Sequence, residues 1–80
     1  MGKALKYLEE ALKIDREIGY KQGEASDLGN IGLIYKAKGD LDKALKFYEE
    51  ALEILDKFKL IYGQDQIQSA ISSIKKIQRN

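Results

Sequence analysis

The sequence predicts an all-α protein, folded as an antiparallel helix-turn-helix solenoid of four helices. The first observation behind this prediction is an internal repeat of forty residues. The second is that apolar residues recur at three- and four-residue spacing in both copies, the pattern of an amphipathic helix. The third is composition, because the 80 residues include no Pro, Val or Thr, which fit poorly in helix interiors.

The repeat is clearest where residues 3–14 read KALKYLEEALKI and residues 43–54 read KALKFYEEALEI, with nine of the twelve positions identical. Gly23 and Gly63 keep the same register. Self-similarity at such a period is typical of stacked helical repeats. We therefore expect a single domain over residues 1–80, with one unit at 1–40 and a second at 41–80.

The first two helices are separated by Gly19, because glycine readily adopts the left-handed conformation that ends a helix. The second helix is predicted from about Lys21 to Lys38. Its apolar stripe comprises Ala25, Leu28, Ile31 and Tyr35.

The third helix is predicted to begin at Leu41, with Asp40 as its N-cap and Gly39 as the stop of the helix before it. Its main apolar stripe comprises Leu41, Ala44, Leu45, Tyr48, Ala51, Leu52, Leu55 and Phe58. A second apolar line follows Phe47, Ile54 and Ile61. A helix that is apolar on two sides is expected to have neighbours on both.

The last helix is predicted from about Gln64 to Gln78. Outside its apolar face, its residues are mostly Gln, Ser and Lys. The apolar face comprises Ile67, Ala70, Ile71, Ile74 and Ile77. A polar outer face is what a terminal capping helix requires.

Composition argues against several classes of function. The chain has no His and no Cys, so we expect no metal site, no cofactor and no enzymatic activity. The net charge of +1 makes a nucleic-acid partner unlikely on electrostatic grounds. The apolar runs are too short to span a membrane, so we expect no membrane partner and a cytoplasmic protein. The five Tyr residues are expected mainly in the core.

The segments Leu28–Tyr35 (LGNIGLIY) and Gly39–Ala44 (GDLDKA), followed by Tyr48, Ala51 and Leu52, resemble the tetratricopeptide repeat in its forty-residue class. The resemblance implies that small residues such as Gly32 let paired helices approach closely. It also assigns the helix order B-A-B-A, where A and B are the first and second helices of a repeat. The last helix is then a degenerate A helix, with Ser72 and Lys75 where Gly32 and Tyr35 stand.

The same resemblance implies a non-catalytic scaffold that binds a peptide or protein segment in a concave groove lined by the A helices. Carried over by position, the groove residues are Ser26, Asn30, Leu33, Lys36, Ala37, Gln66, Ala70, Ser73, Lys76 and Ile77. Asn30 is the sharpest candidate, since a side-chain amide both donates and accepts hydrogen bonds. The alternative is a solvated helix Asn. Lys36 and Lys76 would favour an acidic partner, or simply form a solvated face.

A second hypothesis is self-association into a homodimer. Tyr7, Ile14 and Ile18 have no preceding A helix to cover them, and exposed apolar surface of this kind is typical of an interface. The same gap also fits a chain excised from a longer repeat array.

Overall fold

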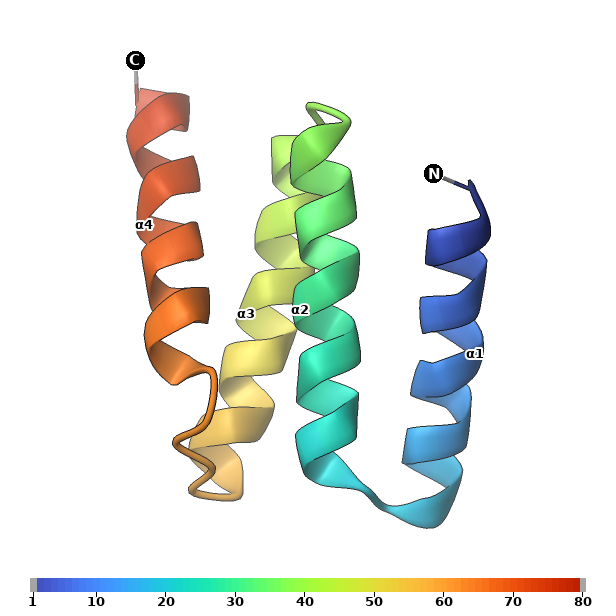
Figure 1. Cartoon of the computed structure of the whole chain (residues 1–80). Helices are drawn as coiled ribbons and strands as arrows, with labels where there is room; N and C mark the ends of the chain where they lie inside the picture. The colour runs from blue at the N-terminus through green and yellow to red at the C-terminus, as the bar shows by residue number, and fades with distance from the viewer. Residues whose placement is uncertain (1, 80) are drawn as a thin grey trace.

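The structure, a computed structural model, describes residues 2–79 and contains four α-helices over that range (Figure 1). Their bounds are α1 Gly2–Ile18, α2 Lys21–Ala37, α3 Leu41–Lys57 and α4 Gln64–Arg79. The all-α prediction is confirmed. The starts of α2, α3 and α4 are as predicted, and the ends of α2 and α4 lie within one residue of the predicted ones.

The turn between α2 and α3 has the predicted chemistry. Gly39 has a φ of +85°, in the left-handed region that glycine adopts without steric cost. The Asp40 side chain accepts a hydrogen bond of 3.2 Å from the backbone N–H of Lys43. This bond satisfies one of the free donors at the start of α3 and fixes where that helix begins.

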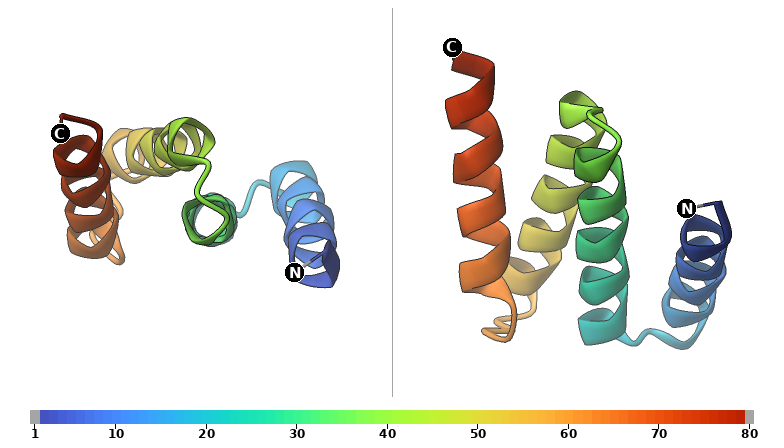
Figure 2. Two further views of the ribbon diagram at one scale, coloured as in Figure 1. Left: turned by 90° about the horizontal axis from the view of Figure 1, so that it is seen from above. Right: turned by 45° about the horizontal axis from the view of Figure 1, so that its top comes forward.

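Neighbouring helices along the chain are also neighbours in space (Figure 1). The contact between α2 and α3 is the most extensive, α1 packs against α2, and α4 packs against α3. Figure 2 shows, from above, that the four helices form a zigzag rather than a straight row. This arrangement is that of a helical-repeat solenoid.

The core is centred between α2 and α3, and its apolar members are those that the stripes predicted. They are Ala25, Leu28 and Ile31 from α2 and Ala44, Tyr48, Ala51 and Leu55 from α3. From α4, Ile67, Ile71 and Ile74 complete the core, whereas the one buried residue of α1 is Leu12. The implied role of Gly32 is supported, because a Cβ there would lie 3.2 Å from three ring atoms of Tyr48.

The interface between α1 and α2 contains polar groups. Glu24 is buried and accepts hydrogen bonds from Arg16 Nε at 3.0 Å and from Lys21 Nζ at 3.3 Å. Nearby, Oδ2 of Asp27 is buried without a hydrogen-bond partner. Burial raises the pKa of Asp27 from 3.8 to about 7, and the Asp15 carboxyl adds to this shift because it accepts a hydrogen bond from protonated Asp27 and repels its charged form.

Two sequence expectations about apolar residues were wrong. Ile61 does not continue the second stripe of α3, because α3 ends at Lys57 and Ile61 is exposed in the following loop. Tyr7, Tyr20 and Tyr62 are also exposed, so only Tyr48 is a buried member of the core and Tyr35 packs partly against it. Tyr20 and Tyr62 lie outside the helices, and Tyr7 lies on the face of α1 that no other helix covers.

Candidate peptide-binding groove

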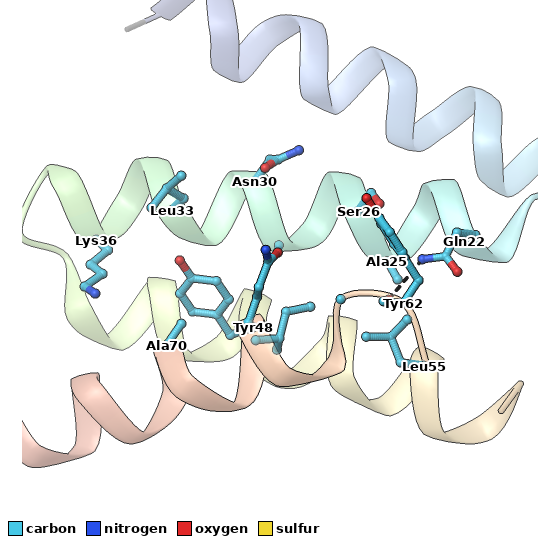
Figure 3. A pocket seen from close by; sticks show the side chains of 14 residues that line it. Gln22, Ala25, Ser26, Asn30, Leu33, Lys36, Tyr48, Leu55, Tyr62 and Ala70 are labelled. Atoms are coloured by element: carbon cyan, nitrogen blue, oxygen red, sulfur yellow. Dashed lines mark hydrogen bonds between the residues drawn. The ribbon is translucent and has the colours of Figure 1, made fainter. Parts of the chain in front are cut away.

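A groove of about 410 Å³ lies between α2 and α4, and α3 forms its floor (Figure 3). Six of the residues predicted for the groove line it. They are Ser26, Asn30, Leu33 and Lys36 from α2 and Gln66 and Ala70 from α4.

The face of α2 that lines the groove follows from helical spacing. Gln22, Ser26, Asn30, Leu33 and Lys36 succeed one another every three or four residues, so they form one line along the helix. The adjacent face, with Leu28 and Ile31, is buried. The same helix therefore anchors itself in the core and presents a row of mixed polarity to the groove.

Several groove residues were not predicted. They are Gln22, Ala25, Gly29, Tyr48, Leu55, Tyr62, Gly63 and Ile67. The repeat contains a signal for two of them. One helical turn before Ser26 lies Gln22, and the position equivalent to Gln22 forty residues later is Tyr62. The others belong to the floor and the walls, which depend on how α3 and α4 approach α2.

Tyr48 of α3 forms part of the floor. The residue is 4% exposed, and its ring packs against Gly32 of α2. Burial raises the pKa of the Tyr48 phenol above its ordinary value of 10.0, so the hydroxyl stays protonated and uncharged at neutral pH. The floor is thus a neutral aromatic surface.

The loop between α3 and α4 closes one end of the groove. The backbone N–H of Leu60 donates to the carbonyl of Leu55 at 2.7 Å, and Nε2 of Gln64 donates to the carbonyl of Leu60 at 3.1 Å. Nε2 of Gln22 donates to the Tyr62 carbonyl at 3.3 Å, which ties the loop to the start of α2. The Tyr62 side chain itself is 76% exposed.

The opposite end of the groove is marked by Lys36 (Figure 3). It is the one charged residue among the described residues that line the groove. Two further lysines stand near this end of α2, with Lys38 Nζ and Lys43 Nζ at 5.6 Å and 5.3 Å from the centroid of the Tyr35 ring. These two ammonium groups interact with the aromatic face rather than with the groove.

The other predicted groove residues lie elsewhere. Ala37 is exposed at the end of α2. Ser73 and Lys76 line a separate, shallow hollow on α4, and Ile77 is also exposed. Lys36 and Lys76 are therefore not brought together on one groove wall. Assigning groove residues by their position in the repeat does not predict where Ser73 and Lys76 lie, because the groove wall formed by α4 ends where α4 diverges from α2.

The groove offers the chemistry of recognition. Gln22, Asn30 and Gln66 carry side-chain amides, which match the donors and acceptors of a polypeptide backbone. Leu33 and Tyr62 offer exposed apolar surface. Within residues 2–79, no group of three or more acidic side chains is placed to hold a metal ion. In the same range, no helix is long and apolar enough to cross a membrane.

The residues predicted for self-association lie on the outer side of α1. Tyr7, Ile14 and Ile18 are 72%, 56% and 69% exposed. The equivalent of Tyr7 on α3 has a neighbour, because the Phe47 ring stacks on Tyr35 of α2 at 5.5 Å between centroids. The face of α3 that carries Phe47 is thus covered by α2, whereas the equivalent face of α1, which carries Tyr7, is exposed.

Comparison with known proteins gives one family. The family model described as tetratricopeptide repeat matches residues 1–57, which include α1, α2 and α3. The groove residues of α4 lie outside this match. No curated protein and no solved structure matched the chain.

Proposed function

Because this chain belongs to the tetratricopeptide repeat family, whose members generally mediate protein-protein interactions, we propose that it is a non-catalytic scaffold that binds a peptide segment between α2 and α4. The observation that carries this proposal is the groove itself, where amide side chains of Asn30 and Gln66 line a hollow with an apolar floor. We further propose a cytoplasmic location, which the absence of Cys from the sequence supports.

The groove proposal is tested by following backbone amide shifts during titration with short synthetic peptides. We expect shifts at Asn30, Leu33 and Gln66, and an Asn30→Ala variant should bind at least several-fold more weakly, because the lost amide leaves a backbone hydrogen bond unmade. The matched control is Ser73→Ala, an equally exposed position outside the groove. Shifts confined to α1 and to the outer side of α3 would contradict the proposal.

A second candidate function is homodimer formation through α1. The exposed Tyr7 lies in a hollow with Lys3, Lys6 and Glu10, so two copies of this face present both signs of charge to each other. Such a self-complementary patch is what a two-fold interface needs. This candidate is independent of the groove, because α1 contributes nothing to the groove lining.

Light scattering over a concentration series distinguishes the two candidates. For the dimer we expect a rise in mass that Tyr7→Glu abolishes and Ile61→Glu leaves intact, since Ile61 is equally apolar and exposed but lies far along the chain from α1. A monomer at every concentration would reject self-association and leave the groove proposal unaffected.

A further inference from the structure

We propose that the groove binds an extended segment of about seven residues that has a bulky apolar side chain at one end and a carboxylate at the other. The apolar end would lie beside Tyr62 and the carboxylate beside Lys36. This inference rests on the proposed function of the groove and adds the chemical class of its partner.

The length of the segment follows from the length of the groove. Gln22 and Lys36 lie at opposite ends and are fourteen positions apart on α2, which corresponds to about 21 Å of helix (Figure 3). An extended chain advances about 3.3 Å per residue, so about seven residues span this distance. An extended partner that runs the length of the groove would therefore have about seven residues.

The Tyr62 end has room for a large side chain. Gly63 lines the groove at this end, and a Cβ on Gly63 would meet nothing within 4 Å. The Tyr62 ring is 76% exposed on one side of this space, while Leu55 provides a buried apolar floor. An aromatic or branched aliphatic side chain would cover the exposed Tyr62 ring, which gives this end its preference.

The Lys36 end has an unbalanced charge. No Asp or Glu is among the residues that line the groove, and none of the salt bridges within residues 2–79 includes Lys36. The ammonium group is thus available to a carboxylate of a partner. Because the rest of the lining is neutral, a second charge elsewhere in the partner would gain nothing from the groove.

The test uses N-acetylated, C-amidated heptapeptides with the spacer Ala-Gln-Ala-Gln-Ala between Phe and Asp, synthesised in both orders. Matched peptides replace Phe by Ala or Asp by Gln. Affinity is measured by calorimetry, and binding to the groove is checked by the amide shifts of Asn30. In the preferred order we expect Phe to improve affinity about tenfold over Ala. We expect Asp to improve it about two- to fivefold over Gln, since the ion pair is partly solvated.

Variants assign each preference to its end of the groove. Lys36→Gln should remove the preference for Asp, whereas Lys38→Gln, the same charge change on a lysine that faces Tyr35, should preserve it. Tyr62→Ala should reduce the preference for Phe, whereas Ile61→Ala, an exposed neighbour outside the groove, should not.

The outcomes separate this inference from the function on which it rests. Equal affinities for all peptides, with shifts at Asn30, overturn the two-ended partner and leave the groove as a peptide site. Equal effects of Lys36→Gln and Lys38→Gln also overturn it. If no peptide shifts Asn30 or Gln66 at millimolar concentration, both the inference and the groove function are overturned.

Discussion

The carboxyl groups of Asp15 in α1 and Asp27 in α2 make the stability of the fold depend on pH. The pKa of Asp27 is about 7 in the folded chain and 3.8 as its ordinary value. The folded state therefore holds a proton that the unfolded chain has already released, over the range between these two values. The contribution of Asp27 to stability is therefore highest at acidic pH, falls as the pH rises from about 4 to about 7, and then levels off.

The magnitude follows from proton linkage. Each tenfold change in proton affinity corresponds to about 1.4 kcal/mol. If the whole difference between the two pKa values acts on folding, the free energy of unfolding falls by about 2.6 kcal/mol between pH 5 and pH 8. Asp27 is only partly buried, although its Oδ2 is covered, so solvent screens the repulsion from Asp15. We expect a measured loss of about 1–2 kcal/mol.

Urea unfolding followed by circular dichroism at pH 5, 6, 7 and 8 measures this loss. An Asp27→Asn variant should keep nearly constant stability over this range, because its amide donates to the Asp15 carboxylate at every pH. The matched control is Glu17→Gln, which removes one charge from an exposed position of α1 and should retain the dependence of the unmodified chain. A slope that Asp27→Asn leaves unchanged would refute the reasoning.

Three further predictions concern helix geometry. Gly29→Ala should raise the free energy of unfolding by about 0.5–1 kcal/mol through helix propensity, because its Cβ meets Ile67 at an ordinary 3.5 Å. Gly32→Ala gains the same propensity but crowds the Tyr48 ring at 3.2 Å, so overpacking of about 1–3 kcal/mol should leave it less stable than Gly29→Ala in thermal melts. Asp40→Ala should cost about 1 kcal/mol in urea unfolding, whereas Asp40→Asn should recover most of it. Equal stability of the two glycine variants, or of Asp40→Ala and the unmodified chain, would contradict these expectations.

The fold could be predicted almost completely because its signals are local. Helical spacing, the left-handed stop at Gly39 and the cap at Asp40 each act within a few residues, and the repeat shows the helical spacing of residues 3–14 a second time in residues 43–54. Loop residues were harder, as the exposed position of Ile61 shows. Its spacing from Ile54 continues the stripe, yet the chain has already left the helix at that point.

The residues that line the groove could be predicted well along α2 and only in part along α4, where Gln66 and Ala70 line it. The line from Ser26 to Lys36 depends on the geometry of one helix, and these residues lie along one side of the groove. The opposite wall depends on the path of α4 relative to α2, which sequence spacing does not contain, and Ser73 and Lys76 fall outside it. The Asp15–Asp27 pair was not foreseen for a similar reason, since two carboxylates from different helices meet only once the helices pack.

The small contribution of α1 to the core bears on cooperativity. With Leu12 as its buried residue, and with attachment mainly to α2, this helix can separate without opening the contact between α2 and α3. Its free energy of opening then lies below that of the whole chain, as in a solenoid whose end repeats fray first. Amide hydrogens of α1 should exchange with solvent before those of α2 and α3, so the two helices that carry most of the core form the last cooperative unit to unfold.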